Sequence, residues 1–380
     1  MNMRKVFKQM LATVAAGAMS MAMVMPVFAK DINYPQTEAW ISKTYNTEVG
    51  KAETFSFTAI QKTGDGLIGT TADVKMPTIE FTADKTGTHS KRGQITFPTY
   101  QEAGKYEYTV KESDTVTPAV TNGDHEKMIM SQAKYTMDVY VTDGENGPEI
   151  SNIVVNKTND DAGQTATGKV DISNTDDNDF KFTNTYVQEA GTGTDPTNPD
   201  PTYDQFGSLN VSKKVVNANG TTATSDNEFA FTATFAFPTG TDANTLGGIK
   251  DANGEVVKLA EGGTYTFNLK ANKNMKFTGV PVGTTITVKE TATKNYKGSA
   301  KVVLNGGTSQ TVSANKYYEE LTAVNNQKLG QNQNTVDVTN TYNDVPLTGI
   351  IMNNLPYIAM IVIGAAALVV YVQNKRKNLQ

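Results

Sequence analysis

The feature that most constrains the fold is a repeat of four sequence landmarks, which occur in the same order in both halves of the chain. The landmarks are a strand-like segment with a lysine, a Phe-x-Phe-Thr-Ala segment, a segment ending in Lys-Glu and a closing Thr-Asn-Thr-Tyr. They lie at residues 40–45, 55–59, 108–112 and 183–186 in the first half, and at 209–214, 229–233, 286–290 and 339–342 in the second. An ordered repeat of this kind predicts two copies of one domain type.

Both halves have the residue pattern of β-strands. Segments such as 105–110 and 284–289 are rich in Tyr, Val and Thr, alternate in polarity, and are bounded elsewhere by turn pairs such as Asn219-Gly220. The only helical pattern outside the two termini is a short one near 315–325. The sequence therefore predicts an all-β protein with two tandem Ig-like antiparallel β-sandwiches.

The composition also predicts the domain boundaries. Residues 188–205 read QEAGTGTDPTNPDPTYDQ, which is typical of an extended linker, with Gly191-Thr192-Gly193 as a flexible hinge. We therefore expect sandwich domains at 31–187 and 206–343.

Strand parity predicts an unusual set of buried side chains in each domain. Residues two apart share a face of a strand, so each half places one lysine, one glutamate and one asparagine on faces otherwise made of core residues. These residues are Lys43, Glu112 and Asn184 in the first half and Lys213, Glu290 and Asn340 in the second. Lys214 is an alternative to Lys213, although its parity is opposite to that of Leu209 and Val211.

Burying these three groups together suggests a reaction. Desolvation lowers the pKa of a lysine and raises that of a glutamate, so a proton can pass from amine to carboxylate and leave a neutral nucleophile. The amine can then attack the asparagine carbonyl while the protonated glutamate hydrogen-bonds the amide oxygen and helps ammonia to leave. The product is a Lys-Asn isopeptide bond. The alternative is a buried ion pair with an asparagine that caps a turn, but recurrence in both halves of a chain without cysteine favours the bond.

The N-terminus has the pattern of a signal peptide over residues 1–29. Arg4, Lys5 and Lys8 precede an apolar stretch at 11–24, and Val27-Phe28-Ala29 offers a small-residue cleavage site. The sequence therefore predicts export of the chain.

The C-terminal region, 345–380, combines a short motif, an apolar run and a basic end. The motif consists of Val345, Pro346, Leu347, Thr348 and Gly349. The apolar run at 355–372 has 18 residues (372 − 355 + 1), or about 27 Å as a helix, which suffices to cross a bilayer core. Three consecutive cations at 375–377 favour a cytoplasmic end. These features predict transient membrane insertion, with a plain membrane anchor as the alternative.

Two resemblances follow from these residues. The motif resembles the LPxTG signal that sortases of Gram-positive bacteria read, with Val345 in place of Leu; this implies cleavage after Thr348 and transfer of its carbonyl to an amine. The YTVKE and FTNTY landmarks resemble those of the isopeptide-linkage domain in streptococcal backbone pilins of the T-antigen or FctA type, and the second half is similar to related pilin and adhesin domains. The resemblance implies bonds between Lys43 and Asn184 and between Lys213 and Asn340, assisted by the two glutamates.

One departure concerns polymerisation. Many backbone pilins carry a YPK motif whose lysine attacks the threonine carbonyl of the next subunit, whereas Tyr34-Pro35-Gln36 lacks the amine. T-antigen-like pilins also lack an obvious version. Lys157 and Lys181 are candidates for the attacking amine, with a solvated surface role as the alternative for each.

Other function classes have little support in the composition. The chain has two histidines and no cysteine, which argues against His/Cys metal sites and Ser-His or Cys-His catalysis, so we expect no metal, no cofactor and no enzyme. The terminal segments carry six cations and no acid, so residues 30–349 have a formal charge of −11 against −5 for the whole chain, which argues against nucleic-acid binding.

The sequence thus predicts a secreted structural protein of the cell wall and surface pilus, most simply a major pilin. Its expected partners are sortase, other pilin subunits, peptidoglycan and a host surface ligand. The alternative is a monomeric wall-anchored adhesin that binds a host or matrix ligand.

Overall fold

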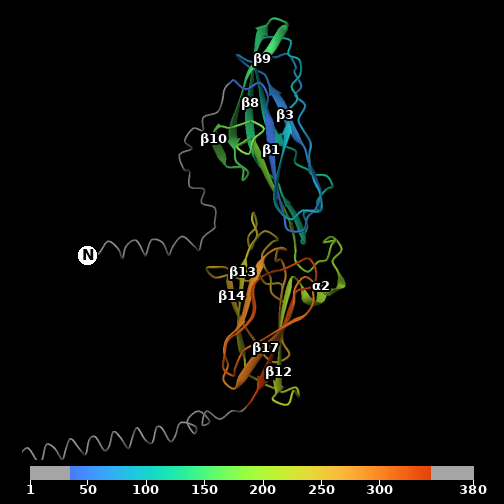
Figure 1. The fold of residues 1–380 in the computed structure, drawn as a ribbon, viewed down its shortest axis with the longest axis vertical. Helices are drawn as coiled ribbons and strands as arrows, with labels where there is room; N and C mark the ends of the chain where they lie inside the picture. Colours follow the sequence, from blue (N-terminus) through green and yellow to red (C-terminus); the bar gives the residue numbers. More distant parts are fainter. Residues whose placement is uncertain (1–34, 344–380) are drawn as a thin grey trace, which may run out of the picture.

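The computed structural model describes residues 35–343, so the predicted signal peptide and the sorting motif with its apolar segment lie outside the described residues. Within 35–343, no helix is long and apolar enough to cross a membrane. Two β-sheet units lie end to end, one coloured blue to green and the other yellow to red (Figure 1). The predicted all-β class with two sandwiches is confirmed.

The first sandwich packs a four-stranded sheet against a five-stranded sheet. The four-stranded sheet contains, in order, β5 (Gly87–Gln94), β1 (Trp40–Thr47), β11 (Lys181–Gln188) and β7 (Glu126–Ile129). The five-stranded sheet contains β10 (Thr165–Lys169), β9 (Gly147–Asn159), β8 (Lys134–Gly144), β6 (Gly104–Glu112) and β3 (Phe57–Lys62). A two-stranded ribbon of β2 (Glu53–Phe55) and β4 (Ile79–Phe81) completes the unit.

The second sandwich has the same two-layer construction. Its five-stranded sheet contains β15 (Asn274–Phe277), β12 (Leu209–Asn217), β20 (Thr335–Tyr342), β17 (Tyr296–Val303) and β18 (Gln310–Ser313). Its four-stranded sheet contains β14 (Thr264–Leu269), β13 (Phe229–Ala236), β16 (Thr285–Glu290) and β19 (Leu321–Lys328). The short helix expected at 315–325 was wrong, because Leu321 and Ala323 point into the core with the two-residue period of β19.

The terminal strands of each unit are parallel neighbours, although the rest of the pairing is antiparallel. β1 pairs with β11 so that Tyr45 lies opposite Asn184, and β12 pairs with β20 so that Val215 lies opposite Asn340. In both units, therefore, the asparagine lies opposite the residue two positions after the lysine. The whole domain between the strands serves as the crossover that a parallel pair needs.

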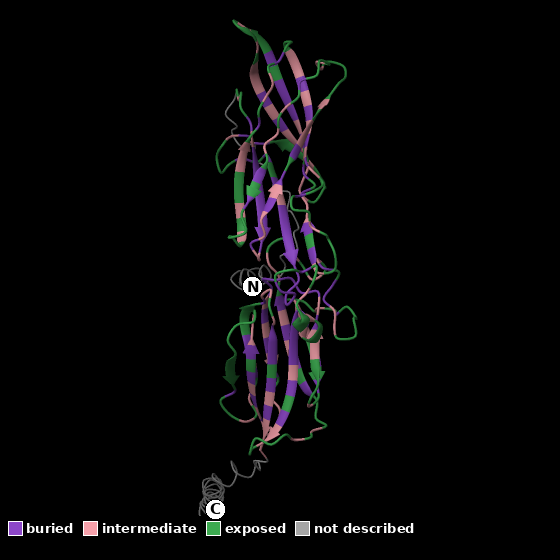
Figure 2. Cartoon of the chain, turned by 90° about the vertical axis from the view of Figure 1, so that its right-hand side faces the viewer, coloured by how far each residue is buried: buried purple, intermediate pink, exposed green. Residues whose placement is uncertain are grey.

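Alternating burial fills the space between the sheets. Along β6, Tyr106, Tyr108, Val110 and Glu112 are buried while the residues between them are partly exposed. Figure 2 shows the same alternation as purple bands along the strands of both units. Because residues two apart share a face, this alternation directs each glutamate toward the facing sheet of its own sandwich. Glu112 therefore faces the sheet that carries Lys43, and Glu290 faces the sheet that carries Lys213.

The first six residues of the predicted linker are part of the packed junction between the units. Gln188, Glu189, Ala190 and Thr192 are buried, and the Ala190 N–H donates to the Val280 carbonyl at 2.8 Å. The interpretation of Gly191-Thr192-Gly193 as a flexible hinge was therefore wrong: the two glycines supply positive φ angles for a tight path along the second sandwich. A short helix, α2 (Pro201–Phe206), follows at the side of the junction (Figure 1).

Glu189 organises this junction. Its Oε2 accepts a hydrogen bond from His125 Nδ1 at 2.7 Å, and its Oε1 accepts from the Tyr203 and Ser208 hydroxyls, each at 2.6 Å, and from the Gly279 N–H at 2.5 Å. The donors come from the first sandwich, α2, the following turn and the second sandwich. One buried carboxylate therefore connects both domains, and the hydrogen bond that His125 donates to Glu189 raises the pKa of His125.

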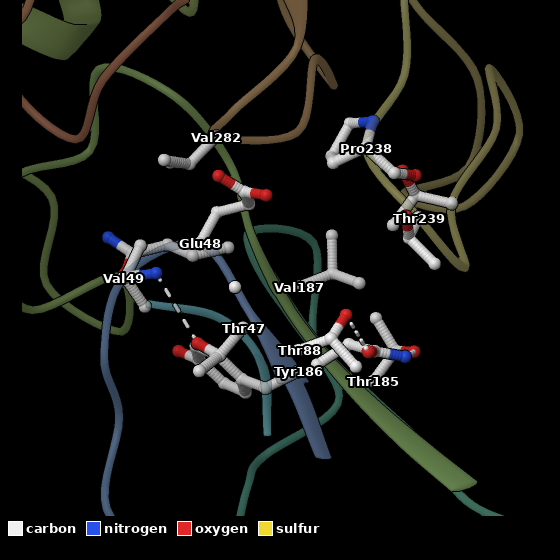
Figure 3. Close-up of a pocket in the computed structure, with 14 residues that line it drawn as sticks. Thr47, Glu48, Val49, Thr88, Thr185, Tyr186, Val187, Pro238, Thr239 and Val282 are labelled. Carbon is white, nitrogen blue, oxygen red and sulfur yellow. Dashed lines mark hydrogen bonds between the residues drawn. The ribbon is translucent and has the colours of Figure 1, made fainter. Parts of the chain in front are cut away.

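A small cavity of about 40 Å³ lies beside the junction, between the end of β1 and the second sandwich. Figure 3 shows Thr47, Thr185 and Val187 on one side and Pro238 and Val282 on the other. This volume suits a water molecule and is far below the size of ordinary ligand pockets. The cavity is a packing feature of the domain contact.

Candidate functional site

The first site lies between the two sheets of the first sandwich. Lys43 on β1 and Asn184 on β11 come from neighbouring parallel strands, and Glu112 reaches them from β6 in the facing sheet. Lys43 Nζ donates to Glu112 Oε1 at 2.6 Å, and Asn184 Nδ2 donates to the same oxygen at 3.2 Å. All three residues are buried.

The second site repeats this geometry. Lys213 Nζ donates to Glu290 Oε1 at 2.5 Å and Asn340 Nδ2 donates to the same oxygen at 2.8 Å. These residues lie on β12, β16 and β20, which correspond to β1, β6 and β11 of the first sandwich. In each domain, therefore, the lysine amine and the asparagine amide donate to the same oxygen of the buried glutamate.

Burial biases both pairs toward their neutral forms. Desolvation lowers the pKa of Lys43 to about 8 and that of Lys213 to about 8. The same desolvation raises the pKa of Glu112 and of Glu290 above the usual range, although the nearby lysines act in the opposite direction. A proton can therefore move from amine to carboxylate at low cost, which leaves a neutral amine beside an amide carbon.

The Phe-x-Phe-Thr-Ala landmark has a role at each amine. Lys43 Nζ lies 4.2 Å from the centroid of the Phe55 ring, and Lys213 Nζ lies 4.2 Å from that of Phe229. Each ring is the first phenylalanine of its landmark. The repeat of this landmark was the only sequence signal for the position of these rings, and by itself it predicts only a strand.

The glutamate contacts a different atom of the amide from the one expected. We expected a protonated glutamate to hydrogen-bond the amide oxygen, whereas Glu112 and Glu290 both accept from the amide nitrogen. This arrangement places the carboxylate between the nucleophile and the group that would leave. The carboxylate is thus in contact with both nitrogens whose protonation changes in an amine–amide exchange.

The remaining candidates are distributed as follows. Lys214 is exposed on the opposite face of β12, so only Lys213 contacts Glu290. Lys181 is exposed at the start of β11, and Lys157 Nζ lies 5.5 Å from the centroid of the Tyr135 ring. Among residues 35–343, no group of three His, Cys, Asp or Glu side chains has an arrangement suited to a metal ion.

A third lysine–carboxylate cluster offers a useful contrast. Lys105 Nζ lies 3.0 Å from Glu107 Oε2 and 3.1 Å from Asp138 Oδ1, but the Lys105 side chain is 29% exposed. Burial is the largest single influence on the pKa of Lys105 and lowers it, but the hydrogen bonds to Glu107 and Asp138 and the charges of these two residues together raise the pKa above its usual value. This amine stays charged, so it lacks the nucleophilic form that burial favours at the other two lysines.

Comparison with known proteins gives a family for the first sandwich. Residues 39–187 match the family described as the Spy0128-like isopeptide containing domain, FctA, and residues 207–342 match a domain of unknown function, DUF7601. The first match confirms the expected resemblance to pilin isopeptide domains. No curated protein matches the chain in sequence.

Matches among solved structures include two streptococcal major pilins and a bacterial adhesin. The major pilin from Streptococcus pyogenes is 19% identical, with a TM-score of 0.31, over 80% of this chain and 98% of that one. The S. pyogenes major pilin T3.2 is 20% identical, with a TM-score of 0.31, over 81% and 99%. A bacterial adhesin from Mobiluncus mulieris is 15% identical, with a TM-score of 0.23, over 81% and 91%.

Proposed function

Proceeding from the assignment of residues 39–187 to the Spy0128-like isopeptide domain family, we propose that this chain is a structural surface protein of a Gram-positive bacterium. It serves as a major pilin subunit that sortase joins to other subunits and to peptidoglycan. Each sandwich is closed by its own isopeptide bond, Lys43 to Asn184 and Lys213 to Asn340. The observation that carries the proposal is the recurrence, at the same strand register, of a buried amine and amide on one carboxylate oxygen.

The bond forms by transamidation within the folded domain. The neutral Lys43 amine attacks Asn184 Cγ, and the new C–Nζ bond forms as the C–Nδ2 bond breaks. Glu112 Oε1 takes a proton from Nζ and delivers it to Nδ2, which leaves as ammonia. Both nitrogens already donate to this oxygen, at 2.6 and 3.2 Å, so the proton has a short path. Glu290 acts in the same way on Lys213 and Asn340. No oxidant, reductant or cofactor is consumed.

The positions of the bonds suit a protein under tension. Each bond joins the parallel terminal strands of a sandwich, which pulling on the domain ends would load in shear. The closed loops span 141 residues (184 − 43) and 127 residues (340 − 213). With both bonds in place, force passes through covalent links rather than through the hydrogen bonds between β1 and β11 or between β12 and β20.

The sequence signals at the two ends support export and wall attachment. The motif at 345–349 begins two residues after Asn343, the last described residue, which directly follows β20. Cleavage after Thr348 would therefore attach the next amine a few residues beyond the second cross-linked sandwich. The amine belongs either to another copy of the chain or to the wall.

Two experiments test the proposal. The intact mass of the purified protein should fall short of its sequence mass by two molecules of ammonia, and full sequence mass would refute the isopeptide bonds. Wall extracts should contain a high-mass ladder that withstands boiling in detergent and disappears with Thr348→Ala. A single wall-linked band that is sensitive to the same substitution would instead identify a monomeric adhesin.

A further inference from the structure

The two sites differ at the amide oxygen. The Ser131 backbone N–H donates to Asn184 Oδ1 at 2.8 Å. Asn340 Oδ1 of the second site is buried and has no hydrogen-bond partner among the described residues. The carbonyl that would accept the attack is therefore polarised by a fixed donor only in the first sandwich.

A side-chain network holds Ser131 in this position. Ser131 lies between β7 and β8, and its hydroxyl donates to Asp161 Oδ1 at 2.5 Å. The same carboxylate oxygen accepts the Thr183 N–H at 2.8 Å, and the Asp161 carbonyl accepts the Gln132 N–H at 3.0 Å. Asp161 thus joins the loop that carries the donor to the strand residue that precedes Asn184. The distance between the Ser131 N–H and the amide oxygen depends on this connection.

We infer that the Ser131 backbone N–H is the oxyanion donor of the first site, with Asp161 as its positioning residue, and that the first bond therefore forms faster than the second. This inference rests on the proposed isopeptide function. When Lys43 Nζ attacks Asn184 Cγ, the carbonyl electron pair moves onto Oδ1, which becomes an oxyanion. The Ser131 N–H stabilises that charge until the C–Nδ2 bond breaks and ammonia leaves with the proton carried by Glu112.

The donor also selects the orientation of the amide. A backbone N–H is satisfied only by an oxygen at Oδ1, so Asn184 presents its nitrogen to Glu112 and its oxygen to Ser131. Nothing among the described residues holds Asn340 Oδ1 in the same way. The first site is therefore oriented for the reaction in advance, and the second relies on Glu290 alone.

The charge of Asp161 acts separately from its geometry. Burial dominates the lowered pKa of Lys43, and the negative charges of Glu112 and Asp161 oppose that shift. Asp161→Asn removes the charge but keeps an oxygen that can accept from Ser131 and Thr183. Asp161→Ala removes both, so the pair of variants separates positioning from charge.

The test is a time course of bond formation on the full chain, produced by cell-free synthesis and stopped with acid at intervals. Digestion and mass spectrometry then give the linked fraction at each site, and the linkage rate of the second site in the same chain is the internal reference. In the wild type the first site should link at least about tenfold faster than the second, since a single oxyanion donor contributes on the order of 10²–10³ in rate. Asp161→Ala should remove most of that advantage, and Asp161→Asn should stay within about twofold of the wild type.

Asp160→Ala is the matched control. Asp160 Oδ1 caps the same turn by accepting the Ala162 and Gln164 N–H groups, without contact to Ser131. Its loss should leave the first rate within about twofold of the wild type. Asp161→Ala and Asp161→Asn both remove a charge that raises the pKa of Lys43, so any shift in the midpoint of the pH dependence should be the same in the two variants, and only Asp161→Ala should lose rate. Equal slowing by Asp160→Ala and Asp161→Ala, equal slowing by Asp161→Asn and Asp161→Ala, or a first site no faster than the second would overturn the inference. Absence of any linkage at either site would instead refute the proposed function.

Discussion

Glu112→Gln separates the covalent bond from the packing around it. Glutamine keeps the volume of the side chain and an acceptor for Lys43, but it cannot carry a proton between two nitrogens. The first bond should therefore be absent and the second intact. After allowance for the substitution, the variant should be heavier than the wild type by one molecule of ammonia.

The stability cost follows from the size of the loop. Opening a closed loop of 141 residues (184 − 43) costs about 5 kcal/mol in the chain-entropy model developed for disulfides. For a domain of this size, about 5 kcal/mol corresponds to a melting temperature lower by roughly 10–20 °C. Calorimetry should show this change in the transition of the first sandwich, with the second transition as the reference.

Glu107→Gln is the control on the same strand. Glu107 faces the partly exposed Lys62 and Lys105 on the outer side of the sheet, so its loss should cost up to about 1 kcal/mol and leave both bonds formed. If Glu112→Gln still forms the first bond, Glu112 is not the proton carrier. If the bond is lost but the first transition shifts no more than in Glu107→Gln, the loop-closure reasoning is wrong.

Three further predictions follow from the same structure. Lys213→Ala should abolish the second bond while Lys214→Ala leaves it, because only Lys213 reaches the buried glutamate, and equal intact mass deficits in the two variants would contradict this. Bond formation should slow at acidic pH. Burial lowers the pKa of Lys43 to about 8, so a fraction of the amine is neutral near neutral pH, whereas at acidic pH both the amine and the carboxyl group stay protonated. A linkage rate that does not fall as the pH is lowered from about 7 to about 4 would refute the neutral-amine mechanism. The hydrogen bond that His125 donates to Glu189 raises the pKa of His125. The stabilisation of the domain junction by His125 is therefore fully present below the unfolded-state pKa of about 6.5 and is lost as pH rises through the raised value. Hydrogen exchange at the junction, corrected for intrinsic rates, should show this loss in the wild type and not in His125→Gln, and an identical pH response in both would exclude His125 as the cause.

The alternation of side chains along the strands was the most informative sequence signal. It placed Lys43 and Glu112 on core faces, and the structure buries both. It also separated Lys213 from Lys214, since adjacent residues on a strand point to opposite faces. These inferences depend only on local geometry, which a strand of six or more residues imposes regardless of its neighbours.

The junction shows where local patterns fail. Residues 188–193 have the glycine, threonine and acidic composition of an exposed linker, yet Glu189 is buried because four donors from separate parts of the chain surround it. His125 and Gly279 lie 64 and 90 residues away from Glu189 along the chain. No periodicity in the linker could indicate these partners.

The sequence by itself determined two β-sandwich repeats, the face of each strand that enters the core, and the identity of the lysine, glutamate and asparagine on those faces. Only the tertiary structure decided that the terminal strands run parallel and that one glutamate oxygen contacts both nitrogens. It also decided that the Ser131 N–H, held in place by Asp161, reaches the first amide oxygen, while no described residue donates to the second. The physical reason is that a two-residue period sets the direction of a side chain relative to its own strand. Which atom contacts that side chain across the core depends on the pairing register of the strands and on loops such as 130–133. These loops have no repeating pattern of side-chain direction that a sequence could reveal.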